Sequence, residues 1–169
     1  MTNPATRRRA FAVAAAVAVG LMLSACARGP DGEPGGLGIG VGFGGSAAGT
    51  VQEFVAGIGD RVFFDTDSPE LSAQARQTLD SQARWLNQYV RFRITVEGHA
   101  DERGTREYNI ALGARRAAAV RDYLAALGVA ANRIRTISYG KERPVALCND
   151  ISCWSQNRRA VTVIDNAGA

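Results

Sequence analysis

The stretch "VEGHADERGTREYNIALGARRAAAVRDYL", residues 96–124, decides how this chain folds. It starts as the end of a β-strand, because apolar and polar residues alternate along "RFRITVEG", residues 91–98, as in a strand with one buried face. A turn containing glycine and the chain's only histidine, His99, follows. A helix is then expected from about residue 107 to residue 127, with Gly128 as its C-terminal cap. We therefore predict a strand–turn–helix unit whose turn is charged.

A strand and a helix are expected before this unit. The segment "DRVFFD", residues 60–65, is rich in β-branched and aromatic residues and predicts a strand. The tripeptide "SPE" at residues 68–70 is typical of a helix start, with Ser68 as the N-cap and proline at the first helical position. Apolar residues then recur at three- and four-residue spacing over residues 71–90, which predicts a helix with one apolar face.

Two more strands are expected after the central unit, at residues 133–140 and 158–165. The segment between them, residues 141–157, is predicted to be a loop or a short helix. The order of elements is therefore β-α-β-α-β-loop-β. This order indicates an α/β (α+β) fold, with a mixed four-stranded sheet and the helices packed on one of its faces.

Residues 1–25 have the pattern of an export signal, with three arginines at positions 7–9 followed by an apolar, alanine-rich run. The signal ends in "LSAC", and small residues before Cys26 resemble the lipobox of bacterial lipoproteins. We therefore expect Cys26 to be acylated and to anchor the protein in the outer membrane, facing the periplasm, because acyl chains contribute about 0.8 kcal/mol per buried methylene. The alternative is a coincidental cysteine near an ordinary cleavage site.

The segment after the signal is expected to be a tether. Glycine supplies 10 of the 24 residues from 27 to 50, a composition that cannot bury enough apolar surface to offset its ordering entropy. We thus assign residues 26–50 to a lipidated cysteine with a flexible tether and residues 51–169 to one domain. Loss of the signal removes three arginines and no acid, leaving 17 basic and 16 acidic residues, so a general polyanion binder is not expected.

The two remaining cysteines, Cys148 and Cys153, lie in "LCNDISCW". In an exported protein such a pair predicts a disulfide that closes one loop. The alternative, a metal site at this pair, lacks further cysteine or histidine ligands nearby. We therefore predict no metal and no cofactor.

The charged turn can be considered as a catalytic site, because Glu97, His99, Asp101 and Glu102 lie close together in sequence. However, one histidine with carboxylates is a poor zinc ligand set, and the chain has no nucleophile motif such as GxSxG. A lone histidine in a turn is more often a structural, hydrogen-bonded residue. We therefore do not expect an enzyme.

The same turn and helix favour a binding site. Asn109, Leu112 and Arg116 are spaced i, i+3, i+7 and share one helix face, while Asp101 precedes the helix. A carboxylate beside a guanidinium is complementary to a zwitterion, with Asp101 accepting an ammonium group and Arg116 donating to a carboxylate. The alternative is that these two side chains pair only with each other. Alanine at Asp101 or Arg116 is expected to remove binding and leave the fold intact.

The quoted stretch, together with "ISYGKERP" and "SQNRRAVTV", resembles the OmpA-like peptidoglycan-binding domain family over about residues 59–165. The resemblance implies non-covalent binding of peptidoglycan through the zwitterionic end of diaminopimelate in its peptide stem. By motif, it assigns this role to Asp101, Asn109 and Arg116. It further implies contributions from the turn after the first strand and from the "NRR" motif, at Phe64, Asp65, Asp67 and Arg158.

The resemblance also implies a protein partner, and this sequence departs from the family pattern in two segments. It implies association with a TolB-like periplasmic protein, over a surface that overlaps the peptidoglycan site. The Cys148–Cys153 loop and the altered first turn "FFDTDSPELS" depart from the family pattern. The alternative function is a protein-interaction adaptor of the cell envelope for which wall binding is secondary.

Overall fold

The computed structural model describes residues 48–165 of the 169-residue chain. The predicted signal at residues 1–25, Cys26 and nearly all of the predicted tether lie outside the described residues. The predictions about export, acylation and tethering therefore remain predictions. Among residues 48–165, no helix combines the length and the apolar character needed to cross a bilayer.

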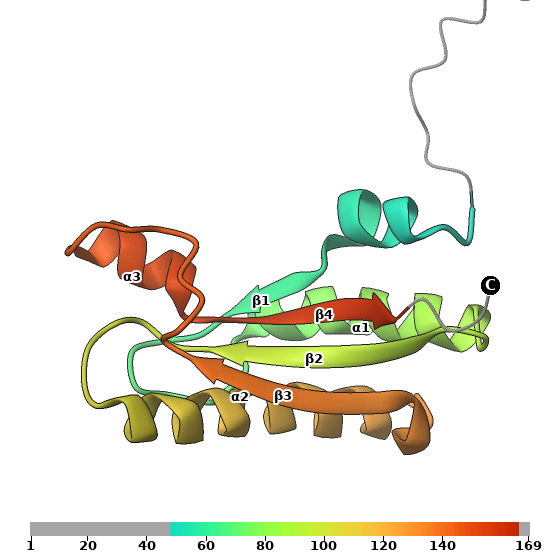
Figure 1. Cartoon of the computed structure of the whole chain (residues 1–169). Coiled ribbons are helices and arrows are strands. Elements are labelled where there is room, and N and C mark those ends of the chain that lie inside the picture. The colour runs from blue at the N-terminus through green and yellow to red at the C-terminus, as the bar shows by residue number, and fades with distance from the viewer. Residues whose placement is uncertain (1–47, 166–169) are drawn as a thin grey trace, which may run out of the picture. The chain divides into compact units, whose positions relative to one another are not determined.

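Four strands form a single mixed sheet in the order β1-β4-β2-β3 (Figure 1). Strand β2 pairs with β3 in parallel, whereas β4 pairs with both β1 and β2 in antiparallel orientation. The elements in chain order are η1 (Glu53–Gly59), β1 (Arg61–Phe63), α1 (Ala73–Gln88), β2 (Arg93–His99), α2 (Arg106–Ala126), η2 (Ala131–Arg133), β3 (Ile134–Gly140), α3 (Ile151–Asn157) and β4 (Arg159–Asp165). The predicted mixed four-stranded sheet is confirmed.

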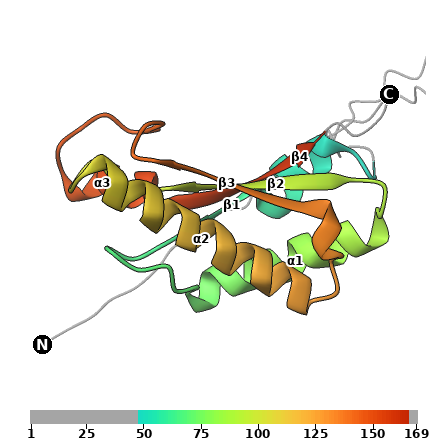
Figure 2. The same ribbon diagram turned by 60° about the horizontal axis from the view of Figure 1, so that its bottom comes forward.

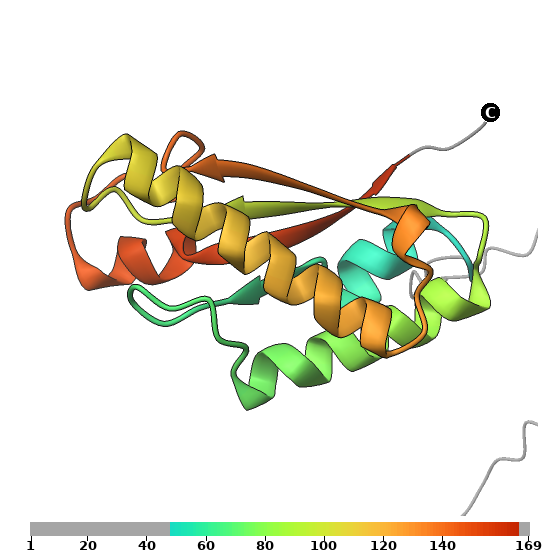
Figure 3. The same cartoon turned by 90° about the horizontal axis from the view of Figure 1, so that it is seen from below.

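Helices α1 and α2 cover the same face of this sheet, as two views from below show (Figures 2 and 3). The core lies between them and the sheet, and several of its side chains are completely buried. These include Leu79, Leu86, Ile94, Val96, Val120 and Leu124. Burial of each such side chain contributes about 1.5–3 kcal/mol, which explains why the apolar spacing of the two helices predicted their packing correctly.

Strand β2 and helix α2 approach each other unusually closely at two glycines. A Cβ atom added to Gly98 would lie 1.9 Å from the carbonyl oxygen of Gly113, far inside van der Waals contact. Only glycine at this position allows the helix to lie against the end of the strand. The approach places the first turns of α2 beside the charged turn that follows β2.

The second helix agrees with its prediction at both ends. It begins after Thr105, whose Oγ1 accepts a hydrogen bond from the backbone N–H of Tyr108 at 3.2 Å. It ends at Ala126, and Gly128 follows with φ of 93°, the left-handed conformation that glycine adopts without strain. The short helix allowed for in residues 141–157 is α3, whose N-cap is Asp150.

The start of the first helix was predicted wrongly. Helix α1 begins at Ala73 and is capped by Ser72, whose Oγ accepts from the N–H of Ala75 at 3.1 Å. Ser68 lies outside the helix because its carbonyl oxygen accepts a hydrogen bond from Nε of Arg116 at 2.9 Å. Both serines are competent caps by local sequence, so the long-range bond decides between them. Strand β1 is likewise shorter than predicted, and helix η1 was not predicted.

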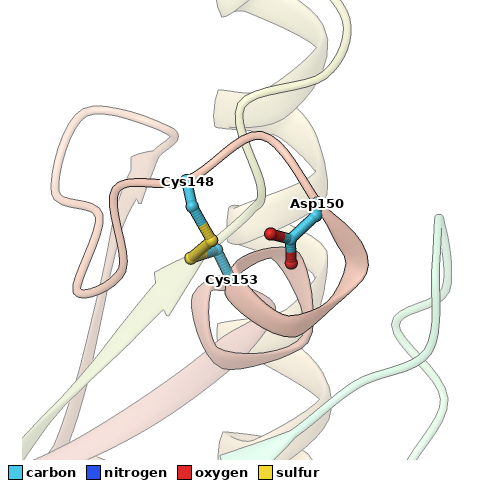
Figure 4. Close-up of side chains that lie close together, drawn as sticks. All are labelled: Cys148, Asp150 and Cys153. Atoms are coloured by element: carbon cyan, nitrogen blue, oxygen red, sulfur yellow. A yellow bond between two sulfur atoms is a disulfide. The ribbon is translucent and has the colours of Figure 1, made fainter.

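Cys148 and Cys153 form the predicted disulfide, with their Cα atoms 5.6 Å apart (Figure 4). Asp150 lies beside them, so that ligand-type atoms of the three residues are within 4.8 Å of one another. Sulfur atoms joined in a disulfide are not thiolates, and the thiolate is the form that binds metals. The structure therefore favours the disulfide over the metal pair considered from the sequence.

The disulfide closes a small loop, so its removal is expected to have a moderate effect. Replacing Cys148 by serine and the buried Cys153 by alanine should lower the free energy of unfolding by about 2 kcal/mol, since a short loop regains entropy in the unfolded chain. Urea unfolding of the double variant beside the oxidised protein measures the difference. Equal midpoints and slopes would show that the loop needs no covalent closure.

Candidate ligand-binding pocket

A pocket of about 180 Å³ lies where β2 ends and α2 begins. We call it the charged pocket. It is lined by Thr66, Asp67, Asp101, Arg103, Gly104, Tyr108, Asn109, Leu112 and Arg116. Five of the predicted site residues, namely Asp67, Asp101, Asn109, Leu112 and Arg116, are thus brought together here. The lining contains carboxylates and guanidinium groups within one small cavity.

Asp101 is buried and is paired with two arginines. Its Oδ2 lies 2.7 Å from Nη2 of Arg103 and 3.3 Å from Nη1 of Arg158. Burial alone would raise the pKa of Asp101, but the hydrogen bonds and charge of Arg103, with a further bond from Arg158, outweigh it and hold the pKa below its ordinary value. The carboxylate is therefore ionised at neutral pH, and its two oxygens accept three hydrogen bonds from Arg103 and one from Arg158.

Arg116 is completely buried and binds backbone carbonyl groups. Its Nε, Nη1 and Nη2 donate to the carbonyl oxygens of Ser68, His99 and Asp65 at 2.9, 2.8 and 2.9 Å. Its guanidinium carbon lies 5.1 Å from the centroid of the Phe64 ring. Burial, and then the charge of Arg158, lower the pKa of Arg116 to about 10, so it stays charged at neutral pH.

These contacts change two expectations. Within residues 48–165 the ion pairs of Asp101 are with Arg103 and Arg158, so Asp101 and Arg116 do not simply pair with each other. Arg116 also joins two turns that are far apart in sequence, because Ser68 and Asp65 belong to the segment after β1. The expectation that alanine at position 116 leaves the fold intact is therefore not supported.

Asn109 and Leu112 line the charged pocket from the first turns of α2. The Asn109 amide nitrogen donates to the carbonyl oxygen of Arg103 at 2.7 Å, which fixes the turn before the helix. Its amide oxygen is the group that is left to accept a hydrogen bond from a ligand. Leu112 is 4% exposed and supplies an apolar part of the wall.

Asp67 contributes a second carboxylate from the turn after β1. It is exposed and has φ of 57°, uncommon for a residue with a side chain. The hydroxyl group of Tyr108 donates a hydrogen bond to its Oδ1, and this bond holds the two sides of the charged pocket together. Asp67 thus lines the same pocket as Asp101, with a strained backbone that the sequence did not predict; its role in binding stays a prediction.

Sequence reasoning missed part of the lining, namely Thr66, Arg103, Gly104 and Tyr108. The sequence contains a local signal for two of these four residues. Arg103 follows Asp101 by two residues, and such a spacing lets a side chain fold back onto a carboxylate in a turn. Tyr108 directly precedes Asn109 in the same motif. Thr66 has no comparable signal, because its proximity depends on how the turn after β1 packs.

The other predicted residues lie around a second cavity. Phe64, Asp65 and Arg158 line a pocket of about 400 Å³ together with Phe63, Ser72, Ser155 and Gln156. Arg158 connects the two pockets, because it donates to the Phe64 carbonyl oxygen at 3.1 Å and to Asp101 at 3.3 Å. The predicted set is therefore divided between two neighbouring cavities.

His99 ends β2 and is 1% exposed. Neither ring nitrogen has a hydrogen-bond partner among residues 48–165, so the expected hydrogen-bonded role is wrong, and the ring stacks on Tyr139 with centroids 5.6 Å apart. Burial, then the charges of Arg159 and Arg143, lower the pKa of His99 to about 4. The ring is thus neutral at neutral pH, and its 3.6 Å approach to Glu97 is not an ion pair.

The low pKa of His99 predicts a pH dependence of stability. Between its ordinary pKa of 6.5 and about 4, the unfolded state binds a proton that the folded state does not, so stability falls as pH falls through this window. A single such group accounts for about 3 kcal/mol. Urea unfolding at pH 7.5 and 4.5 is expected to show a smaller difference in a His99→Phe variant than in the parent. Parallel pH profiles would show that His99 does not titrate in this window.

This sheet, with two helices on one face and a charged pocket at the β2–α2 turn, defines an OmpA-like domain. The chain belongs to the OmpA family, whose model matches residues 63–158. The crystal structure of the peptidoglycan-associated lipoprotein from Burkholderia pseudomallei superposes with a TM-score of 0.62 and 44% identity, covering 63% of this chain and 90% of that chain. The C-terminal domain of Helicobacter pylori MotB, at 23% identity and a TM-score of 0.59 over 63% of this chain and 84% of that one, shares the fold.

Curated relatives extend the similarity beyond the domain. The peptidoglycan-associated lipoprotein of Rhizobium meliloti is 56% identical over 171 residues, which covers 99% of this chain and 97% of that protein. The protein of the same name from Mesorhizobium japonicum is 66% identical over 128 residues, 76% of each chain. The family resemblance expected from the quoted motifs is confirmed, and within that family the chain is similar to the peptidoglycan-associated lipoproteins.

Proposed function

We propose that this chain is a lipoprotein of the cell envelope that binds peptidoglycan non-covalently through the charged pocket. The observation that carries the proposal is the lining of that pocket, where Asp101, Asp67, Arg103 and Arg116 place charges of both signs within about 180 Å³. Such a site is complementary to a small zwitterionic group. A relative from Mesorhizobium japonicum that is 66% identical over 128 residues carries the name peptidoglycan-associated lipoprotein, which supports the choice of ligand.

The zwitterion of this proposal is the free end of diaminopimelate in the peptide stem. Its ammonium group binds the ionised carboxylate of Asp101, with Asp67 on the opposite wall. Its carboxylate binds Arg116, since a guanidinium has five N–H groups and three of those in Arg116 are engaged by carbonyl oxygens. Asn109 orients the ligand backbone through its amide oxygen. The function is binding without a chemical step, and no cofactor is required.

The anchor completes the proposed function. Acylated Cys26 holds the protein in the outer membrane, and the glycine-rich residues 27–50 let the domain of residues 51–169 reach the wall. Each charge-assisted hydrogen bond contributes about 1.5–3 kcal/mol, so one stem binds with modest affinity. Anchors confined to one membrane surface raise the effective concentration and make many weak contacts collectively strong. The protein thereby links the outer membrane to the peptidoglycan.

Binding of a protein partner is the second proposed function. We infer a TolB-like periplasmic protein as this partner, within a Tol–Pal system. Support comes from apolar side chains that are exposed at and before the start of α3, because Val145, Leu147 and Ile151 are 54%, 89% and 62% exposed. Clustered exposed apolar side chains often mark protein-binding surfaces. An adaptor role with secondary wall binding predicts that the TolB-like protein displaces a bound muropeptide.

Calorimetric titration tests the proposed ligand. Full-length protein in detergent is titrated with a muropeptide that contains diaminopimelate, and with the same muropeptide amidated at the terminal carboxylate. Binding of the first with clear loss for the second is the expected result. Absence of binding to both, with binding of a TolB-like protein retained, would contradict the wall-binding proposal and favour the adaptor.

A further inference from the structure

Helix α3 packs a tryptophan, Trp154, against Arg103, which lines the charged pocket. The guanidinium carbon of Arg103 lies 4.2 Å from the centroid of the Trp154 ring, within the range of a cation–π contact. The indole N–H of Trp154 donates to the carboxylate of Glu102. One side chain of α3 therefore contacts two consecutive residues of the turn that follows β2, although they are about 50 positions away in the sequence.

The turn from Asp101 to Gly104 is also fixed from two other elements. The ammonium group of Lys141 donates to the carbonyl oxygens of Glu102 and Gly104 at 3.2 and 2.7 Å. The amide of Asn109 holds the Arg103 carbonyl oxygen from α2. These bonds fix the backbone of the turn, but none of them fixes the Arg103 side chain, which has many rotamers of its own.

Arg103 is the accessible cation of the charged pocket. Its side chain is 40% exposed, whereas Arg116 is fully buried. Its Nε and Nη2 donate to the two carboxylate oxygens of Asp101 at 3.2 and 2.7 Å. Its Nη1 has no hydrogen-bond partner within residues 48–165, so this edge of the guanidinium is available to a ligand. The position of that edge depends on what supports the guanidinium plane.

We propose that Trp154 is a positioning residue for the charged pocket. Its ring holds the Arg103 guanidinium flat against Asp101, and this keeps the Nη1 edge available for the carboxylate of a zwitterionic ligand beside Arg116. The inference rests on the proposed binding function and assigns Arg103 to recognition of the ligand carboxylate. Helix α3 thereby determines the specificity of a pocket that the sheet and α2 build.

Single and double variants in the full-length protein, purified in detergent, test this proposal. Trp154→Ala should weaken binding of the free-carboxylate muropeptide by about threefold to fivefold, as expected for loss of an exposed cation–π contact, and should leave binding of the amidated muropeptide unchanged. Trp154→Phe is the matched control, because it keeps a ring over Arg103 and loses the N–H donated to Glu102. It should bind within about twofold of the parent, since the ring is retained.

A double-variant cycle shows whether Trp154 acts through Arg103. In an Arg103→Ala background, Trp154→Ala should cause no further loss of affinity. An equal loss in both backgrounds, or a loss in Trp154→Phe as large as in Trp154→Ala, would overturn the proposal. The first result would mean that Trp154 acts elsewhere, and the second that its bond to Glu102 is what matters.

A measurement without ligand separates this inference from the proposed function. The Nε–H proton signal of Arg103 in the ligand-free protein should be shifted upfield by the ring current of Trp154, and the shift should disappear in Trp154→Ala. If the parent shows this shift and binds no muropeptide, the proposed ligand is wrong and the positioning of Arg103 stands. Identical Arg103 signals in the parent and in Trp154→Ala would overturn the positioning itself.

Discussion

Arg116→Ala is expected to lower the free energy of unfolding by about 3–5 kcal/mol, because three carbonyl groups lose a charged donor and a large buried side chain is removed. The guanidinium is fully buried, and three carbonyl oxygens accept from it. Without it, the buried carbonyl oxygen of His99 and the partly buried ones of Asp65 and Ser68 lose this donor, and a cavity remains. Because domains have only about 5–15 kcal/mol of stability, the variant should unfold at much lower urea concentration.

Arg115→Ala is the matched control, because Arg115 is the preceding residue of the same helix and is exposed. Its removal should change the free energy of unfolding by less than about 0.5 kcal/mol, as is usual for surface positions. Urea titration followed by circular dichroism compares the two variants. Stabilities that agree within 1 kcal/mol would show that the carbonyl contacts of Arg116 do not hold the turns together. Any loss of wall binding by Arg116→Ala must be interpreted against this loss of fold.

Asp101→Asn is the cleaner test of recognition and should weaken muropeptide binding by about 10- to 100-fold, which corresponds to one charge-assisted hydrogen bond. The amide keeps the shape of the side chain and one oxygen acceptor, but it removes the charge that attracts an ammonium group. Asparagine is preferred to alanine, because its amide oxygen can still accept a hydrogen bond from the neighbouring arginines, whereas alanine would leave them with no acceptor at this position.

The control for this variant is Glu107→Gln, which removes a charge from an exposed position in the first turn of α2. Calorimetric titration with the diaminopimelate muropeptide should give an affinity close to that of the parent. If both variants bind equally well, the assignment of Asp101 is incorrect. Because the pKa of Asp101 is lowered, binding by the parent should persist as the pH falls to the ordinary pKa of an aspartate, and be lost only as the pH falls through the lowered value.

The local elements of this fold could be predicted because their signals are local. Thr105 caps α2 and Gly128 ends it through bonds to neighbouring residues, and the apolar spacing of α1 and α2 reports which face is buried. The Cys148–Cys153 disulfide joins residues five positions apart, so a single segment of sequence contains all the information needed. The motif from Asp101 to Arg116 is similarly continuous.

The roles within the charged pocket could not be predicted in the same way. Arg116 donates hydrogen bonds to residues 17, 48 and 51 positions away. The residues next to Arg116 in the sequence do not indicate which distant carbonyl groups it will bind. The bond to Ser68 also displaced the predicted helix start to Ala73, because a tertiary contact selected one of two equivalent caps. Trp154 reaches Arg103 only after α3 has packed beside the turn.

The sequence by itself determined the mixed sheet, the two helices on one face, the disulfide and the motif from Asp101 to Arg116 that lines the pocket, because hydrophobic periodicity, caps and motifs act over a few neighbouring residues. Only the tertiary structure decided which charges are paired. It pairs Asp101 with Arg103 and Arg158 and leaves Arg116 bound to carbonyl oxygens. The physical reason is that the partners of a buried polar group are set by the packing of distant segments, and most buried donors and acceptors are satisfied by whatever that packing brings near.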